Sequence, residues 1–381
     1  MRIAIIYDSF FPTNTGGGER VYRRIGESFA NRGHAVDYLT RLQWSPGDEP
    51  QTTMRLVPVW SGEIYDATGV RTTSSALGFA FGVFRQLRAA RKDYDVVVAS
   101  ALPVLTLLAA RFALIGTDVF LIGDWLEFWR ARKWRQYAGV VSGSIAFALQ
   151  SVAVKVARLN TANSRFTADR IELATGESPV VLGLVDLTSG GEMTPVLASA
   201  PPYMVFVGRL IPDKRGVLLP EVLRVARNSF PDLRLVIVGV GPEQDHIVDA
   251  ARMAGVSEHT VLLGRVSDDE LHTIVARAAV LVNPSVREGF GLVVAEAASF
   301  GVPSVVVAGE DNASVDLIEE GINGFVAGDS GAETIGGAVI DAVSAGDRLR
   351  ETTREWFEGA RVESGIEASV DAILARYSMA R

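Results

Sequence analysis

NPSVREGFGLVVAEAASFGVPSVVV, residues 283–307, contains two glutamates eight positions apart with a glycine-rich turn between them. Glu288 precedes the turn at 289–291, and Glu296 lies in the small-residue pattern that follows. This order predicts a strand, the turn, a helix and a second strand. Glycines let a ligand approach the backbone closely, and a helix that starts there directs N–H groups at an anion. The stretch therefore predicts a phosphate site, and a carboxylate at Glu296 suits a pair of sugar hydroxyls.

The length and composition indicate a globular protein of two domains. A chain of 381 residues is long for one core, and 48% of its residues are hydrophobic. It has no cysteine, which excludes disulfides, cysteine-ligated metals and thiol nucleophiles and fits a reducing compartment. The first strand is expected from residue 2 with no signal peptide before it, so we expect a cytoplasmic protein.

The charge is unevenly distributed along the chain. The net charge is −8; residues 1–187 have 21 Lys+Arg against 17 Asp+Glu, net +4, and the remainder has 16 against 28, net −12. An acidic total argues against a nucleic-acid partner, while the basic first half leaves room for an anionic partner there.

Two neighbouring segments bear on membranes. The longest uncharged apolar stretch, 138–154, falls short of a bilayer span and predicts a buried or interfacial helix. The segment WRARKWRQY, 129–137, precedes it and mixes aromatic with basic residues, the latter being Arg130, Arg132, Lys133 and Arg135. Either it is a solvated loop whose aromatic side chains pack on the next helix, or it makes peripheral contact with an anionic lipid surface or a phosphorylated acceptor.

The first half repeats a short apolar run, a turn and an amphipathic helix, which predicts a parallel sheet with helices on both faces. Strands are expected at 3–7, 35–40, 55–60, 95–100 and 117–122, and helices at 19–31, 136–158 and 165–175. A second series of strands is expected at 203–207, 233–238, 260–263, 280–283, 304–307 and 324–326.

The predicted organisation is two doubly wound α/β domains in tandem. Residues 1–187 form an acceptor-side Rossmann-like domain, and 188–202 form a linker rich in Gly, Ser and Pro. Residues 203–360 form a Rossmann-like domain that binds the donor, and 361–381 contain a helix that returns to the first domain.

Two cations follow the first strand of the second series. In open α/β sheets ligands bind beyond the carboxyl ends of the strands, so Arg209 and Lys214 stand where a bound phosphate needs positive charge. A guanidinium and an ammonium can share the charge of a diphosphate. The alternative is a solvated basic loop.

These motifs together resemble the donor-binding half of the retaining glycosyltransferases of family 4, which have the GT-B fold of two facing Rossmann-like domains with a cleft between them. Four segments carry the resemblance: GRLIPDKRG (208–216), VIVGVGP (236–242), LLGRVSDDEL (262–271) and the stretch quoted first, whose spacing of Glu288 and Glu296 is the family's signature. NTGGGERVYRRIGESFANRGHAVDYLT (14–40) is similar to the family's Gly-Gly loop with its helix, turn and strand.

The resemblance implies a role for each matching position. Arg209 and Lys214 would hold the donor diphosphate and neutralise the leaving group. Glu288 would contact the transferred sugar, and Glu296 would bind the ribose hydroxyls. Further donor contacts are implied for Gly16, Gly17, Val266, Gly289, Phe290, Gly291, Leu292 and Val293.

The chain departs from the family at one place. Many members have a histidine after the fifth strand of the first domain, where this chain reads GDWLE, 123–127. Asp124 or Glu127 either takes over part of the role of that histidine in contacting sugar or acceptor, or is a structural carboxylate. The identity of the sugar stays open.

The expected function is metal-independent, retaining transfer of a sugar from a nucleoside-diphosphate sugar to an acceptor hydroxyl, without a further cofactor. The acceptor is a glycan, a lipid-linked molecule or a small molecule. The one D-x-D, at 93–95, is expected in a surface turn before a strand and not in a metal site. Alternatives are a non-catalytic nucleotide-sugar-binding subunit, or an epimerase or phosphorylase of the same fold. The loop at 15–19 lacks the G-x-G-x-x-G of a nicotinamide dehydrogenase.

Overall fold

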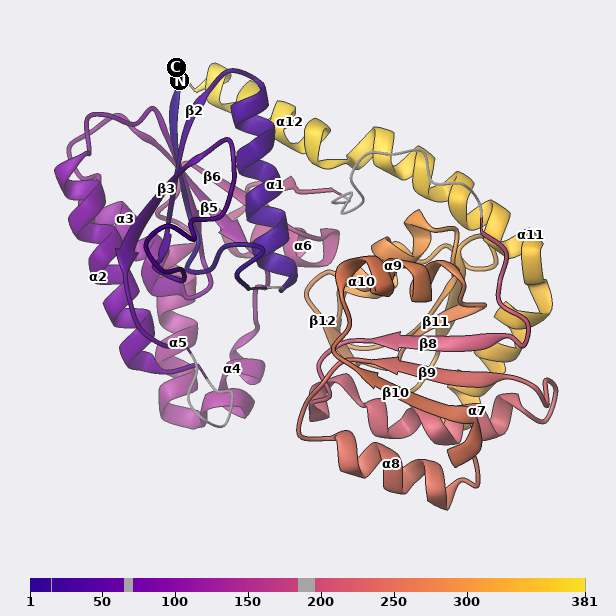
Figure 1. The fold of residues 1–381 in the computed structure, drawn as a ribbon. Coiled ribbons are helices and arrows are strands. Elements are labelled where there is room, and N and C mark those ends of the chain that lie inside the picture. Colours follow the sequence, from indigo (N-terminus) through magenta and orange to yellow (C-terminus); the bar gives the residue numbers. More distant parts are fainter. Residues whose placement is uncertain (15, 65–70, 184–195, 381) are drawn as a thin grey trace. The chain divides into compact units, whose positions relative to one another are not determined.

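A computed structural model describes residues 1–14, 16–64, 71–183 and 196–380. The chain divides into unit 1, made of Met1–Val185 and Ser364–Arg381, and unit 2, made of Asp186–Glu363. Both units are drawn in Figure 1. The first part of the predicted linker, 188–195, lies outside the described residues, and 196–202 has no regular secondary structure.

Unit 1 contains a parallel sheet of seven strands in the order β3-β2-β1-β4-β5-β6-β7. The strands are β1 Arg2–Ile6, β2 Ala35–Arg41, β3 Arg55–Trp60, β4 Val96–Ser100, β5 Phe120–Trp125, β6 Leu159–Ala162 and β7 Val180–Val181. The central strands β4 and β5 are buried along their whole length, as expected of a sheet covered on both faces.

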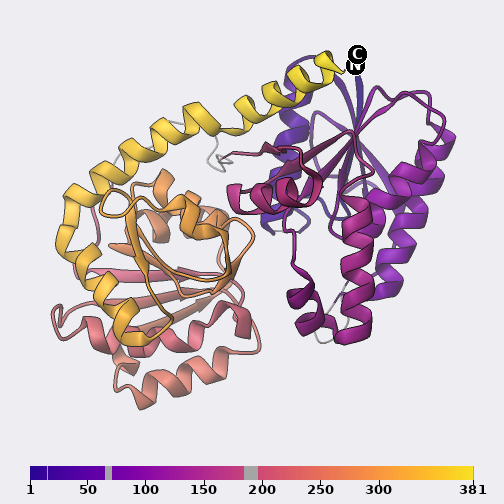
Figure 2. The ribbon, with the colours of Figure 1, turned by 180° about the vertical axis from the view of Figure 1, so that it is seen from behind.

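The helices of unit 1 cover both faces of its sheet. They are α1 Gly17–Asn31, α2 Thr73–Ala89, α3 Val104–Ala113, α4 Ala131–Ala138, α5 Val140–Ala153, α6 Arg165–Thr175 and α12 Ile366–Met379. Helices α1 and α12 lie together on one face, and α2, α3 and α5 lie on the other (Figures 1 and 2). Helix α12 belongs to unit 1 although it is the last element of the chain, and Arg32, the C-cap of α1, pairs with Asp371 of α12 at 2.9 Å.

The prediction of one long helix at 136–158 was wrong. Helix α4 ends at Gly139, whose φ of 81° does not continue an α-helix, and α5 starts directly after it. The two helices pack so closely that a Cβ at Gly143 would lie 2.3 Å from the carbonyl oxygen of Trp134. The strand expected at 117–122 also lies three residues later, because a turn at Gly116 with φ 79° follows α3.

Unit 2 contains a six-stranded parallel sheet in the order β10-β9-β8-β11-β13-β15, and a small sheet of β12 and β14. The strands are β8 Tyr203–Val207, β9 Arg234–Val238, β10 Thr260–Gly264, β11 Val280–Asn283, β12 Arg287–Glu288, β13 Ser304–Val307, β14 Asp311–Asn312 and β15 Gly324–Ala327. The predicted alternation of strands and helices is therefore found in both units.

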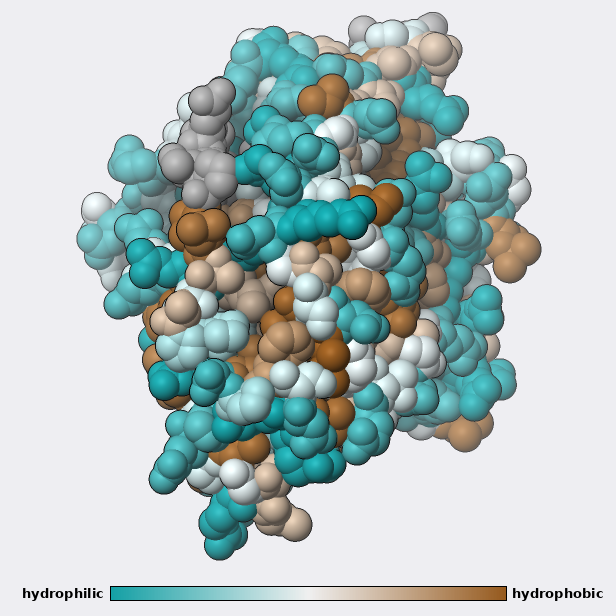
Figure 3. All heavy atoms as spheres, turned by 90° about the vertical axis from the view of Figure 1, so that its right-hand side faces the viewer, coloured by the Kyte–Doolittle hydropathy of each residue, from teal (hydrophilic) through white to brown (hydrophobic). Residues whose placement is uncertain are grey.

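The helices of unit 2 pack an apolar core against its sheet. The α-helices are α7 Leu219–Ala226, α8 Gln244–Met253, α9 Asp268–Ala276, α10 Leu292–Ser299 and α11 Ala332–Ser364, and the 3₁₀ turns are η1 Pro212–Lys214, η2 Gly216–Leu218, η3 Ser257–His259 and η4 Ala313–Leu317. Helix α11 is kinked at Gly346, where φ is 55°. Figure 3 shows hydrophilic and hydrophobic side chains mixed over one side of the molecule, as is ordinary for a folded chain.

Two adjacent glycines of α11 offer a matched test of packing. A Cβ at Gly336 would lie 2.5 Å from Cγ1 of Val225, whereas a Cβ at Gly337 would meet nothing within 4 Å. We expect Gly336→Ala to lower the free energy of unfolding by about 1–3 kcal/mol because the core is overpacked. Gly337→Ala should leave it unchanged or raise it by up to ~1 kcal/mol through helix propensity. Urea denaturation of both variants measures these changes in the free energy of unfolding. Equal changes in the two variants would contradict the close packing of Gly336 on Val225 of α7.

Candidate functional site

The strand order of unit 2 reverses direction between β8 and β11. From β8 the chain runs outward through β9 to β10, and it then returns to place β11 on the other side of β8. The crevice beyond the carboxyl ends of strands at such a switch point is where open α/β sheets bind ligands. The loops after β8 and β11 contain Lys214 and Glu288, so both predicted residues lie at this edge.

Two ion pairs join these loops. Nζ of Lys214 lies 2.5 Å from Oε1 of Glu288, and Nη1 of Arg287 lies 3.0 Å from Oδ2 of Asp213. The side chains of Lys214 and Glu288 are 25% and 12% exposed, so their pair is largely screened from solvent. The amide of Asn283 donates to the same Glu288 oxygen at 3.2 Å. The structure thus brings Lys214 and Glu288 together, and adds Asn283, for which the sequence motifs predicted no role.

Helix α10 begins at the glycine turn beside this pair. Gly291 is its N-cap with φ 93° and ψ 47°, and a Cβ there would lie 2.6 Å from Cβ of Ser314. Only glycine fits this position without strain. Leu292 and Val293 are the first two residues of the helix, whose N–H groups have no partner within it. Glu296 is partly buried in the second turn of the same helix.

Asn312 holds the signature loop in place. Its amide donates to the carbonyl oxygens of Ser285 at 3.0 Å and Val307 at 2.7 Å, and its Oδ1 accepts from the N–H of Ser314 at 3.1 Å. Strand β14, which contains Asn312, pairs with β12, where Glu288 lies opposite Asn312. Asn312 is also the N-cap of the 3₁₀ turn η4.

Arg209 lies at the same edge without joining the ion pairs. Its side chain is exposed, and within the described part of the chain no ion pair of Arg209 is found. The loop that contains it is packed on the next one, since a Cβ at Gly239 would lie 1.9 Å from the carbonyl oxygen of Gly208. Val266, which the resemblance implies as a donor contact, follows β10 and its side chain is partly buried.

The glycine loop of unit 1 packs onto Tyr7. Gly16 is the N-cap of α1 and Gly17 is its first residue. A Cβ at Gly18 would lie 2.5 Å from the hydroxyl of Tyr7, whose ring stacks on Tyr22 with centroids 4.3 Å apart. The loop therefore lies at the carboxyl end of β1, the corresponding edge of the first sheet.

Asp124 is a fully buried carboxylate at the end of β5. It is 0% exposed, and it accepts hydrogen bonds from the hydroxyl of Thr161 at 2.5 Å and from the hydroxyl of Tyr22. Burial raises the pKa of Asp124 to about 6, and the two hydrogen bonds act in the opposite direction. The side chain faces the core, which favours the structural alternative over a direct contact with sugar or acceptor. Glu127 lies two residues beyond β5 and accepts a hydrogen bond from Nε1 of Trp129.

A second buried pair at this edge was missed by the sequence motifs. Asp8 follows β1 and pairs with Arg71, which precedes α2. Burial lowers the pKa of Arg71, and Asp8 is 5% exposed. An aspartate directly after the first strand of a parallel sheet was the available signal, but nothing in the spacing named its partner.

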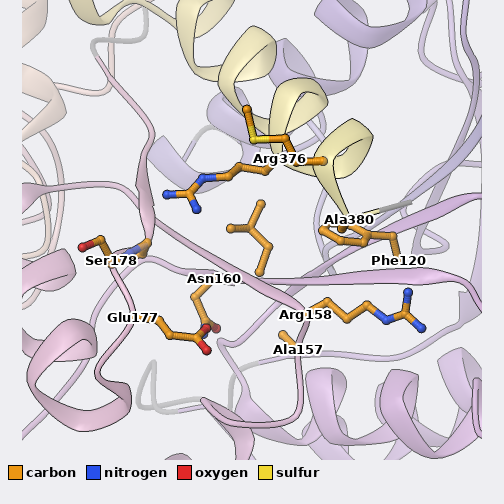
Figure 4. A pocket seen from close by; sticks show the side chains of 11 residues that line it. Phe120, Ala157, Arg158, Asn160, Glu177, Ser178, Arg376 and Ala380 are labelled. Atoms are coloured by element: carbon orange, nitrogen blue, oxygen red, sulfur yellow. The ribbon is translucent and has the colours of Figure 1, made fainter.

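A cavity of 830 Å³ lies at the opposite edge of unit 1 (Figure 4). It is lined by the amino ends of β5 and β6 and by the last turns of α12. The guanidinium groups of Arg158 and Arg376 point in different directions in Figure 4. The cavity includes none of the predicted site residues, so it is not the candidate site.

Comparisons with known proteins agree with the motifs. Residues 195–361 match the family model described as glycosyl transferases group 1. This confirms the resemblance that the second half indicates, whereas assignment to family 4 stays a prediction.

Two relatives illustrate the similarity. A GDP-mannose-dependent alpha-(1-6)-phosphatidylinositol monomannoside mannosyltransferase of Mycolicibacterium smegmatis is 33% identical over 162 residues, 40% of this chain and 40% of that protein. The chain thus spans less than half the length of this relative. A glycogen synthase of Mycobacterium tuberculosis is 26% identical over 338 residues, 80% of this chain and 77% of that protein.

The fold is shared with solved structures. Sucrose-phosphate synthase from Thermosynechococcus elongatus has a TM-score of 0.75 and 17% identity, over 99% of this chain and 98% of that chain. This likeness, with the two parallel-sheet units, confirms the prediction of a GT-B fold.

The burial of Asp124 predicts a pH-dependent stability. Its pKa in the folded chain is about 6 against an ordinary value of 3.8, so the folded protein binds this proton more tightly than the unfolded chain does. The contribution of Asp124 to stability therefore falls as the pH rises from about 4 to 6. Asp124→Asn keeps the size of the side chain but cannot titrate. Between pH 4 and pH 7, we expect the free energy of unfolding of the wild type to fall by roughly 2–3 kcal/mol relative to that of Asp124→Asn, as measured by urea denaturation. If the free energies of unfolding of the two proteins changed equally with pH, the raised pKa of Asp124 would be contradicted.

Proposed function

We propose that the protein is a retaining, metal-independent glycosyltransferase that moves a sugar from a nucleoside-diphosphate sugar to an acceptor hydroxyl. Unit 2 binds the donor, with the diphosphate between Lys214, Arg209 and the start of α10. Unit 1 binds the acceptor, which is a glycan, a lipid-linked molecule or a small molecule. A peripheral contact of unit 1 with a membrane belongs to the same proposal.

One observation carries the proposal: Lys214, Glu288 and the amino end of α10 meet at the switch point of the unit 2 sheet. An ammonium group beside a glycine-capped helix start is suited to an anion, because both place positive charge and N–H donors at one point. The carboxylate of Glu288 supplies an acceptor for sugar hydroxyls beside that point.

The chemistry of transfer explains why these groups are useful. Cleavage of the bond between sugar and diphosphate builds negative charge on the leaving group and positive charge on the sugar carbon. Cations and N–H donors that are already in place stabilise the leaving diphosphate most in the transition state. Lys214 is held by Glu288 before the donor arrives, so little reorganisation is needed.

The remaining donor contacts follow the resemblance. Glu296 binds the ribose hydroxyls, the backbone at Val266 faces the base, and the loop of Gly16 and Gly17 approaches the phosphates. Net retention is proposed because the sequence offers no well-placed base or nucleophile. The position of the D-x-D supports metal independence. Asp95 lies directly before β4 and accepts a hydrogen bond from the N–H of Arg2, so one of the motif's two aspartates has a structural role at the amino end of the sheet.

The ion pair can be tested by removing either partner. Lys214→Ala and Glu288→Ala should each lower kcat by two to three orders of magnitude, about 10²–10³, because each removes a group that acts on the transition state. The control is Arg234→Ala, which removes an exposed cation at the amino end of β9, the opposite edge of the same sheet. Turnover is measured with a panel of nucleotide sugars, chosen first by the rise in melting temperature that a ligand of the folded state causes.

The outcomes separate the alternatives. Unchanged turnover in Lys214→Ala or Glu288→Ala would contradict the assigned roles. An isomerised nucleotide sugar formed without acceptor would indicate an epimerase, and dependence on inorganic phosphate would indicate a phosphorylase. Donor binding without transfer to any acceptor would indicate a binding subunit.

A further inference from the structure

Four helices of unit 1, together with the turn after α3, present large apolar side chains to solvent. Helices α2, α3 and α5 lie side by side on one face of the sheet, and α4 packs on α5 (Figures 1 and 2). We call the following exposed residues the apolar face: Leu77, Phe81, Phe112, Ile115, Tyr137, Val140, Val141, Ile145, Leu149 and Val152. Val140 and Val141 are each 73% exposed and Phe81 is 66% exposed. Large apolar side chains exposed on neighbouring helices are typical of an interaction site.

Helix α5 forms the centre of this face. It has no charged residue, and only Gly143, Gln150 and Ala153 are buried. Val141, Ile145, Leu149 and Val152 follow one another at spacings of three or four residues, so they form a single stripe along the helix. The sequence predicted a buried or interfacial helix here. The four side chains of the stripe are exposed, so the interfacial alternative is the one that remains for them.

The same helices have a one-sided charge. The sequences of α2, α3, α4 and α5 contain no Asp or Glu and six basic residues, which are Arg85, Arg88, Arg111, Arg132, Lys133 and Arg135. Residues 128–168 form a longer stretch with seven Lys or Arg and no acidic residue. Exposed apolar side chains and basic residues thus lie on the same four helices, and this combination is complementary to an anionic, partly apolar partner.

An aromatic cluster lies beside the stripe. The ring of Trp129 lies 4.7 Å from that of Trp134 and 5.2 Å from that of Tyr137, measured between centroids. The indole N–H of Trp134 donates to Gln150 of α5 at 2.9 Å, which fixes the cluster to that helix. Trp and Tyr concentrate at the boundary between lipid headgroups and acyl chains because one end of each ring system is polar.

Charge also distinguishes between possible occupants. A second copy docking by a twofold axis would bring two basic surfaces together, and the four helices offer no carboxylate to pair with them. A bilayer containing anionic lipids supplies the opposite charge and an apolar layer together. Within the residues that the structure describes, no helix is long and apolar enough to cross a membrane.

We propose that the apolar face docks unit 1 on the surface of an anionic bilayer. The stripe of α5 enters the boundary between headgroups and acyl chains, with its axis in the plane of the membrane, and the basic residues of α4 contact the headgroups. Docking is independent of sugar chemistry, but the purpose it serves, bringing the acceptor side to a lipid-linked acceptor, rests on the proposed function.

The test is co-sedimentation of the full chain with vesicles of neutral phosphatidylcholine, alone or mixed with phosphatidylglycerol, at low and at physiological salt. The wild type should bind the anionic vesicles, bind less as salt rises, and bind neutral vesicles weakly. An apolar variant, Val141→Ser with Ile145→Ser and Val152→Ser, should bind at least tenfold more weakly. A charge variant, Arg132→Gln with Lys133→Gln and Arg135→Gln, should lose roughly fivefold per charge.

Matched controls come from outside the apolar face. Leu173→Ser, Met253→Ser and Val362→Ser change three side chains that are 85%, 86% and 76% exposed. Arg234→Gln, Arg252→Gln and Arg348→Gln remove three exposed cations from unit 2. Both triple variants should bind vesicles as the wild type does, and circular dichroism and melting temperature show that every variant is folded.

Three results would overturn the proposal. These are no binding to anionic vesicles at low salt, equal binding to neutral vesicles, or equal loss of binding in the control variants. The alternative occupant, a second copy of the chain, is tested by sedimentation equilibrium without lipid. If the wild type forms a dimer and the apolar variant does not, the apolar face is an interface between two copies. Donor binding measured by thermal shift needs no lipid, so failure of docking and failure of the proposed function can be told apart.

Discussion

The contact between Lys214 and Glu288 joins two loops that are 74 residues apart in the chain, and the candidate site depends on it. Each partner needs the other. An ammonium group on a side chain that is 25% exposed is costly without a counter-charge, and so is a carboxylate on a side chain that is 12% exposed. The turn that presents Lys214 also contains Arg215, the one non-glycine residue with positive φ, 53°, among those described. Strained backbone of this kind persists where surrounding structure holds it, and it is common at functional sites.

The glycines at this edge have two purposes, and sequence motifs reveal only one of them. A glycine turn suggests a backbone that a ligand can approach. In the structure, a Cβ at Gly239 or Gly241 would collide with a carbonyl oxygen of the loop after β8, and a Cβ at Gly291 would collide with Ser314. The loops are thus packed against one another at contact distances that a side chain would prevent. This packing holds the loops of the candidate site in fixed positions.

The sequence predicted the fold more completely than the site. Apolar runs such as 96–100 and 304–307 are legible because buried parallel strands are apolar throughout, and the spacing of Glu288 and Glu296 was enough to find the signature loop. The break at Gly139 was missed because composition alone does not show a positive φ. Asn283 with Glu288, Asp8 with Arg71, and Asp124 with Tyr22 and Thr161 are side-chain pairings across the fold. Hydrophobic periodicity predicts helices and strands, but it does not predict which side chains from distant parts of the chain will meet.

The charge of the second half poses a problem that the local geometry resolves. Residues 188–381 have a net charge of −12, which repels a donor with a diphosphate group. At physiological ionic strength, however, charges farther than about 8 Å act weakly, so nearby groups dominate. At the carboxyl ends of β8 and β11 these groups include Lys214, the exposed Arg209 and the N–H groups that open α10. A negative domain can therefore hold a dianion, provided that its few cations lie at the strand ends and its carboxylates lie elsewhere or are paired, as Glu288 is. The long-range field then sets the rate of encounter, and the short-range contacts set the affinity.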